Sequence, residues 1–194
     1  MRRLLACVLL IGLLTPLTAA QADFSYARVN AVLNQRLSCR SGPGTQYEEP
    51  VNYFSAGTSL TLLAKAYDQR NGVWWVMVEF SYKSMRYRAY TGAKRFDNLN
   101  LDRLPTEVQM GSGSTPGGYP VEAWWGPGAN SYKRMSRNVP GGVSVTIWGY
   151  AYNGAEDTDF VLIEFYDRSM GCTRRAWVKE WAIEETYMDY GRGR

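Results

Sequence analysis

The stretch Ser41-Gly42-Pro43-Gly44-Thr45-Gln46-Tyr47 is the starting point for inferring the fold, because a close copy follows at Trp125-Gly126-Pro127-Gly128-Ala129-Asn130-Ser131-Tyr132. Proline holds φ at about −65° and has no N–H to donate to a sheet, and glycine tolerates positive φ. Gly-Pro-Gly therefore predicts a turn in both places. A tyrosine follows each turn, which indicates that a larger unit is repeated.

The segments around the two turns also repeat, in the same order and at nearly constant spacing. Each later segment lies 85 or 87 residues after the first. Such an arrangement is hard to obtain by chance, so we interpret the chain as two copies of one small β domain. The further matching blocks are 57–63 with 142–148, 78–80 with 163–165, and 89–90 with 176–177.

The first 22 residues are predicted to be a signal peptide. Arg2 and Arg3 precede the apolar run Leu4–Leu14, and Ala20-Gln21-Ala22 has the small-x-small pattern of a cleavage site. The apolar run is too short to span a bilayer as an anchor. We therefore expect an exported protein, periplasmic or secreted, with no membrane span after cleavage of the signal peptide.

The rest of the chain has a small net charge that is unevenly divided. Residues 23–104 carry 11 basic and 7 acidic side chains, whereas residues 105–194 carry 9 basic and 11 acidic side chains. This balance is far from the basic character of nucleic-acid-binding proteins, so no nucleic acid is expected as a partner. An anionic ligand should prefer the positive first copy.

Short stretches of β-branched and apolar residues, bounded by turn signals, indicate strands throughout, and no stretch has helical periodicity with caps. The segment 111–118 has the composition of a linker, but aligning Glu107–Met110 with Arg28–Ala31 makes it a lengthened first loop of the second copy. We expect an all-β protein of two tandem small barrels with five to six short strands each, packed closely because the linker is short. The expected parts are the signal peptide (1–22), a first domain (23–104), a second domain (105–186) and a polar tail (187–194).

Two cysteines, Cys39 and Cys172, lie outside the signal peptide, one in each copy at non-equivalent positions. Export permits a disulfide bond, which would have to join the two domains. Alternatively, Cys39 is a small buried residue within a strand.

The order of motifs in the first copy resembles the bacterial SH3-like domain family. Arg36–Tyr47, Gly57–Leu63 and Asn71–Val78 stand where that family has its Ser-Gly-Pro-Gly-Thr turn, its Gly-Thr-x-Val-x-Val strand and its Gly-Trp-Trp-x-Val strand. Arg88-Ala89-Tyr90 departs from the family's final Gly-Trp-Val, whereas the second copy keeps Ala176-Trp177-Val178. The resemblance covers essentially the whole mature chain. It implies small barrels that act outside the cytoplasm and bind wall peptides or other envelope ligands.

Catalytic constellations are not evident in the sequence. The chain has no histidine, which excludes His-based nucleophilic sites and the usual His-based zinc sites. Glu79 and Glu164 are single acids on equivalent strands, expected to face outward and not to form the carboxylate pair of a glycosidase. The acidic loop with Glu156, Asp157 and Asp159 is either solvated or holds a weak Ca²⁺. We expect no enzyme activity and no cofactor.

Aromatic and basic side chains on the barrel surfaces form the predicted ligand site. If Val76 and Val78 face the core, Trp75 faces outward, and Phe160 occupies the equivalent position in the second copy. The tyrosines after the two turns either flank this platform or pack over the barrel ends. Basic and aromatic residues alternate late in the first copy, which suits an anionic or peptide-carboxylate ligand, or a solvated face. The predicted ligand-binding residues are Tyr47, Trp75, Arg86, Arg88, Tyr90, Tyr132 and Phe160.

These observations favour a non-catalytic envelope protein that binds a peptidoglycan peptide or glycan, with the ligand on the first copy. The alternative is a protein–protein interaction module, such as an inhibitor or assembly factor that grips another envelope protein.

Overall fold

The computed structural model describes residues 26–48 and 51–188, and the predicted signal peptide lies outside this part of the chain. Within these residues the regular structure is strand, apart from three single-turn 3₁₀ helices. The all-β class is therefore confirmed. The strands are β1 (Val29–Val32), β2 (Leu37–Cys39), β3 (Val51–Phe54), β4 (Ser59–Asp68), β5 (Val73–Tyr82), β6 (Met85–Gly92), β7 (Gly111–Ser114), β8 (Ser144–Asn153), β9 (Thr158–Asp167), β10 (Cys172–Lys179) and β11 (Glu184–Met188). The 3₁₀ helices are η1 (Ala93–Arg95), η2 (Leu101–Arg103) and η3 (Glu180–Ala182).

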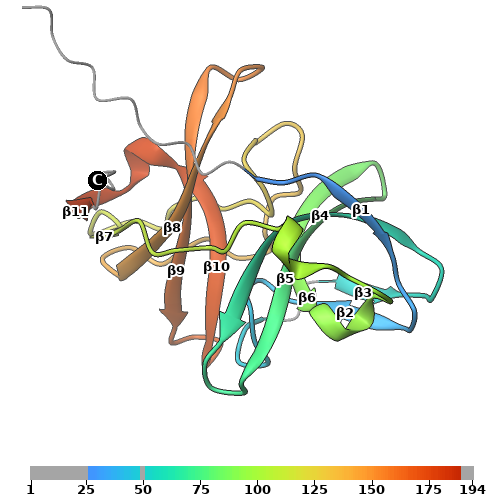
Figure 1. Ribbon diagram of the computed structural model, residues 1–194. Coiled ribbons are helices and arrows are strands. Elements are labelled where there is room, and N and C mark those ends of the chain that lie inside the picture. Colours follow the sequence, from blue (N-terminus) through green and yellow to red (C-terminus); the bar gives the residue numbers. More distant parts are fainter. Residues whose placement is uncertain (1–25, 49–50, 189–194) are drawn as a thin grey trace, which may run out of the picture.

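The strands form two main antiparallel sheets that share an arrangement of four strands, to which the second sheet adds β11 (Figure 1). The first has the order β1-β4-β5-β6, and the second has the order β10-β9-β8-β7-β11. A separate two-stranded sheet pairs β2 with β3. Among the described residues both main sheets are open, so the closed barrels expected from the sequence are not formed.

The repeat is visible in the strand register as well as in the sequence. The β4–β5 pairing shifts between Leu62 and Ala64, and the β8–β9 pairing shifts between Ile147 and Gly149, 85 residues later. The inner faces of the two sheets bury equivalent positions of the repeat, as alternation along a strand requires. These fully or nearly fully buried pairs are Leu62 and Ile147, Val76 and Val161, Val78 and Ile163, and Ala89 and Ala176.

The segment 111–118 differs from its expected role. Gly111–Ser114 is strand β7, which pairs with β8 on one side and with β11 on the other. It is the counterpart of β1, because β1 pairs with β4 as β7 pairs with β8. Gly111 and Gly113 are buried, and a sheet accepts such small residues where another backbone approaches closely. The expected loop is therefore a central strand.

The end of the chain also differs from the expected polar tail. Strand β11 continues to Met188, two residues into the segment 187–194 that was assigned to the tail. It forms the edge of the second sheet next to β7. The remaining residues, 189–194, lie outside the described part of the chain.

The connection between the halves pairs with strand β4 of the first sheet. The amide of Lys65 in β4 donates to the carbonyl of Pro105 at 2.8 Å, and the amide of Glu107 donates back to the carbonyl of Lys65 at 2.8 Å. Figure 1 shows β10 lying beside the β4–β5–β6 sheet at the centre of the molecule. The two halves are thus in direct contact, and this contact holds most of the predicted ligand residues.

Candidate functional site

The predicted ligand residues come together, but in the contact between the two halves and not on a free surface. Five of the seven are buried, Arg88 is largely buried, and Arg86 is partly exposed. The buried aromatic residues are Tyr47, Trp75, Tyr90, Tyr132 and Phe160.

Trp75 and Phe160 do not form the exposed platform expected from the sequence. Their side chains are 8% and 0% exposed. Strand alternation was correct in placing them on the outer faces of their sheets, but those outer faces pack against each other. The resulting apolar cluster has members from both halves: Leu63, Ala64, Ala66, Trp75, Met77, Tyr90, Trp124, Phe160, Leu162 and Trp177. In this contact the two side chains stabilise the fold.

Each Gly-Pro-Gly turn reaches across to the other half of the molecule. Tyr47 donates its hydroxyl to Oε2 of Glu164 in β9 at 2.6 Å. Tyr132, its counterpart, donates to Oε2 of Glu79 in β5 at 2.5 Å. We call these two reciprocal contacts the tyrosine clasp. The tyrosines therefore join the halves, which is neither of the two roles expected for them.

Backbone hydrogen bonds extend the tyrosine clasp on both sides. The amide of Glu48 donates to the carbonyl of Thr173 in β10 at 3.3 Å. In the other half, the amide of Lys133 donates to the carbonyl of Arg86 in β6 at 3.0 Å, and the amide of Arg86 donates to Ser131 at 3.2 Å. The edge strands β6 and β10 thus each form backbone hydrogen bonds with a segment of the other half.

The first glycine of each turn is needed for close packing. A Cβ atom on Gly42 would overlap the ring of Tyr47, and one on Gly126 would overlap the ring of Tyr132. Both turns are buried. Gly-Pro-Gly followed by a tyrosine therefore encodes a turn against which its own tyrosine ring packs.

Glu79 is buried in this contact, not directed outward to solvent as expected. It accepts hydrogen bonds from Arg28 Nη2 at 2.9 Å, Arg86 Nη2 at 2.5 Å, Arg88 Nε at 3.0 Å and the Tyr132 hydroxyl. Burial alone would raise its pKa. The hydrogen bond from Tyr132 and the charge of Arg88 outweigh that effect, so the pKa of Glu79 is about 2. The carboxylate is therefore ionised at neutral pH.

The equivalent position in the second half has the opposite charge balance. Glu164 accepts from Arg175 Nε at 2.7 Å, and Arg175 Nη1 also donates to Oε2 of Glu107 at 2.8 Å. Glu107 accepts a further hydrogen bond from the Tyr90 hydroxyl at 2.6 Å. Burial raises the pKa of Glu107 although Arg175 and Tyr90 oppose the shift. The single guanidinium of Arg175 is therefore ion-paired with two carboxylates, those of Glu107 and Glu164.

The two cysteines do not form the possible disulfide bond. Both thiols are free. Cys39 is fully buried, and this burial raises the pKa of its thiol. Cys172 is partly buried near the start of β10. Cys39 therefore has the alternative role, that of a small residue packed in the core.

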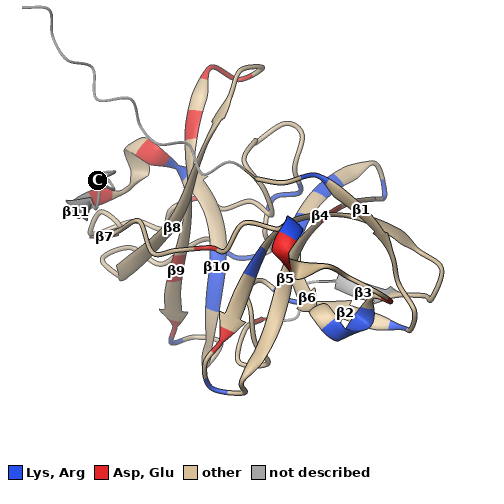
Figure 2. Ribbon diagram, in the orientation of Figure 1, with Lys and Arg blue, Asp and Glu red and all other residues tan. Residues whose placement is uncertain are grey.

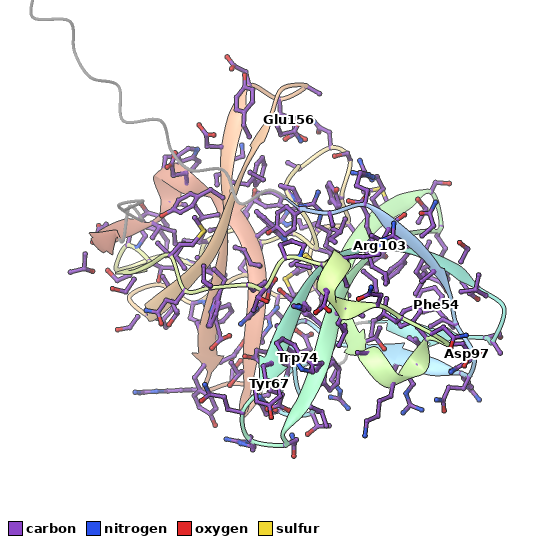
Figure 3. All side chains as sticks on the ribbon, in the orientation of Figure 1. Phe54, Tyr67, Trp74, Asp97, Arg103 and Glu156 are labelled. Atoms are coloured by element: carbon purple, nitrogen blue, oxygen red, sulfur yellow. The ribbon has the colours of Figure 1, made fainter. Side chains whose placement is uncertain are left out.

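The acidic loop supports the second turn. Glu156, at the tip of the β8–β9 hairpin (Figure 3), accepts from the backbone amides of Ala129 at 2.9 Å and Asn130 at 3.0 Å. Figure 2 shows the concentration of acidic residues at this tip. Within the described ranges, no group of three or more Asp, Glu or Cys side chains is arranged to hold a metal ion. The carboxylate of Glu156 acts as a hydrogen-bond acceptor for the turn.

An open groove in the second half carries exposed aromatic side chains. It has a volume of about 280 Å³ and lies between the 116–124 segment and the end of β10 with η3. Trp181 is 76% exposed and Tyr119 is 61% exposed at this groove, whereas Trp124 is buried in its lining. Pro116 and Pro120 add apolar surface. We call this site the aromatic groove. It was not predicted, although Trp181 shortly after β10 and Tyr119-Pro120 after a glycine pair are signals that the sequence contains.

A second groove lies at the corresponding end of the first half, with different chemistry. Its volume is about 420 Å³, and it contains Trp74 and Lys94. Lys94 in η1 occupies the position that Trp181 has in η3. Tyr67 and Trp74, side by side in Figure 3, have ring centroids 5.0 Å apart. Of the two grooves, the aromatic groove of the second half presents the more exposed tryptophan.

Comparison with known protein families, characterised proteins and solved structures gives no match in any of the three. The described residues contain no helix long and apolar enough to cross a membrane.

Proposed function

We propose that the protein is an exported, non-catalytic binding protein of the bacterial cell envelope, built from two SH3-like domains, whose ligand is the glycan or peptide of the wall. The aromatic groove is the observation that carries this proposal. The signal-like N-terminus, the repeated motifs and the absence of histidine from the sequence support it.

The geometry of the aromatic groove suits a ligand with flat apolar faces. Exposed Trp181 and Tyr119 offer ring surfaces that a sugar ring or a peptide side chain can cover, and each also has a polar atom for a hydrogen bond. Lys179 and Glu122 add one charge of each sign at the edge. Aromatic side chains with few polar groups around them are typical of small-ligand and extended-peptide sites.

The ligand site proposed here lies on the second half, whereas the sequence favoured the first. The change follows from burial, because Tyr47 and Trp75 are covered by the other half. An exposed tryptophan leaves a large apolar surface in contact with water, which is unfavourable in the free protein. Exposed apolar surface of this kind frequently marks a binding site.

Sedimentation with purified peptidoglycan sacculi tests the proposal. The wild-type protein should sediment with sacculi, and Trp181→Ala should weaken binding by about 30-fold, the effect of losing an aromatic anchor of about 2 kcal/mol. Tyr166→Ala is the matched control, because Tyr166 is also a strongly exposed aromatic residue but is not part of the groove. It should bind like the wild type, and both variants should keep the wild-type melting temperature.

Two outcomes would contradict the proposal. If the wild type stays in solution and instead crosslinks to a protein partner in stoichiometric amounts, the protein is an interaction module. If Trp181→Ala and Tyr166→Ala both sediment like the wild type, the aromatic groove is not the binding site.

A further inference from the structure

Basic charge is concentrated around Glu79 and not around its counterpart. Three guanidinium groups contact the Glu79 carboxylate, those of Arg28, Arg86 and Arg88. Around Glu164 the single guanidinium of Arg175 is shared with a second carboxylate. Arg88 and Arg175 are equivalent, since each pairs with the glutamate opposite it in the strand register. The additional positive charge therefore comes from Arg28 and Arg86.

The second half has no arginine at the position of Arg86. In β6, the backbone of Arg86 forms a β-bridge with that of Tyr132. In β10, the residue that forms the equivalent β-bridge, with Tyr47, is Thr173. The tyrosine clasp is thus formed with either side chain at this position. The guanidinium of Arg86 does lie over the Tyr132 ring, 4.7 Å from its centroid, but the threonine at the equivalent position shows that the clasp forms without a charge there.

Arg28 and Arg86 are the two accessible members of the basic group. Their side chains are 63% and 41% exposed, whereas that of Arg88 is largely buried. Each uses Nη2 to reach the same oxygen of Glu79, Oε1. Within the described part of the chain, both Arg28 and Arg86 form their ion pair with Glu79. Two converging guanidiniums therefore share one acceptor atom and keep further N–H donors.

A cavity of about 280 Å³ opens beside Arg86. Arg28 is not one of its lining residues, but its guanidinium meets that of Arg86 at the Glu79 carboxylate, which does line the cavity. Arg86 and Glu79 line it together with the hydroxyl-bearing residues Ser59, Thr61 and Ser81. Phe54 and Phe80 also border it, but their rings, with centroids 4.6 Å apart, pack into the core on the face of β5 opposite to Glu79. On the face that carries Glu79, the cavity thus combines positive charge with hydroxyl groups.

We propose that this cavity binds the terminal carboxylate of a short peptide, held by Arg28 and Arg86. Planar guanidiniums bind carboxylates through paired charge-assisted hydrogen bonds. The net charge of the three arginines and Glu79 is +2, so one added carboxylate reduces the excess without reversing it. The hydroxyl groups of Ser59, Thr61 and Ser81 can form hydrogen bonds with the last peptide unit. This site is separate from the aromatic groove and does not depend on it.

Titration calorimetry with a defined peptide tests the assignment. The probe is N-acetyl-alanyl-alanine, and its C-terminal amide is the uncharged control. The carboxylate form should bind, and the amide should bind at least 10-fold more weakly. Arg28→Gln and Arg86→Gln should each weaken binding at least 10-fold, while Arg134→Gln should leave it unchanged. Arg134 is a suitable control because it is a comparably exposed arginine that is paired with Glu122 elsewhere on the surface.

Three results would overturn the assignment. These are equal binding of the acid and the amide, equal loss in all three arginine variants, and inorganic phosphate binding as tightly as the peptide, which would indicate a general anion site. Arg28→Gln keeps the test valid if Arg86→Gln disturbs the clasp, since Arg28 is largely exposed. Repeating the titration with Trp181→Ala separates this site from the aromatic groove, because binding of the probe should persist in that variant.

Discussion

Acidification should weaken the fold through Glu79. Its pKa is about 2 in the folded protein, compared with an ordinary value of 4.5. The folded-state pKa is lowered, so the stabilising contribution is complete above the unfolded pKa and is lost as the pH falls toward 2. The difference corresponds to about 3 kcal/mol of the free energy of unfolding at neutral pH, of which about 2 kcal/mol is lost at pH 3.

The contribution of Glu79 can be isolated by comparison with Glu79→Gln. This variant leaves the surrounding guanidiniums without their carboxylate and should be less stable by about 3–5 kcal/mol at pH 7. Because the glutamine does not titrate, the difference in free energy of unfolding between the variant and the wild type should shrink by about 2 kcal/mol at pH 3. Glu107, whose pKa is raised by burial, has the opposite pH dependence, but it is present in both proteins and cancels in the difference.

Urea unfolding followed by tryptophan fluorescence at pH 7, 5, 4 and 3 measures this gap. Glu122→Gln is the matched control, because Glu122 forms an exposed ion pair with Arg134. This substitution should lower the free energy of unfolding by less than about 1 kcal/mol at each pH. A gap between wild type and Glu79→Gln that is the same at pH 7 and pH 3 would refute the assignment of a strongly lowered pKa to this carboxyl group.

Three further substitutions probe the contact between the halves, each measured by urea unfolding. Tyr132→Phe removes a hydrogen bond to a buried charged group and should cost about 1.5–3 kcal/mol; no change would mean that the clasp is not formed in solution. Phe160→Ala should cost about 3–5 kcal/mol, because the ring is fully buried; a loss below 1 kcal/mol would contradict a packed contact. Arg174→Met should cost a similar amount, since it removes the buried guanidinium that pairs with Glu48 of the first half and with Asp167 of the second; wild-type stability would show that these ion pairs are dispensable.

The strands and the repeat could be predicted from the sequence, because they follow from local alternation and spacing. Val76 and Val78 are buried and their neighbour Trp75 lies on the opposite face, as the pattern indicates. Alternation says which face a residue occupies but not what covers that face. The burial of Trp75 and Phe160 depends on the second half of the molecule, so the pattern could not reveal it.

The main features missed were those that depend on long-range pairing. Gly111–Ser114 has the composition of a linker and becomes a strand only because β8 and β11 flank it. The ring of Tyr132 reaches Glu79 across 53 residues of sequence. The exposure of Trp181 does not follow from the sequence, because tryptophan is on average a highly buried residue and local pattern does not show what covers it.

The tyrosine clasp has the form of an isologous interface, in which the same patch on each of two units contacts the other about a twofold axis. Here the two units belong to one chain, so the contact no longer has to be identical on both sides. The two sides differ at one strand position, which is Arg86 on one side and Thr173 on the other. They also differ in charge, because three guanidiniums contact Glu79 whereas Glu164 contacts one that is shared. Two identical subunits would be unable to maintain such differences. Joining two copies in one polypeptide thus allows one side of a symmetric interface to specialise while the other side keeps the halves together.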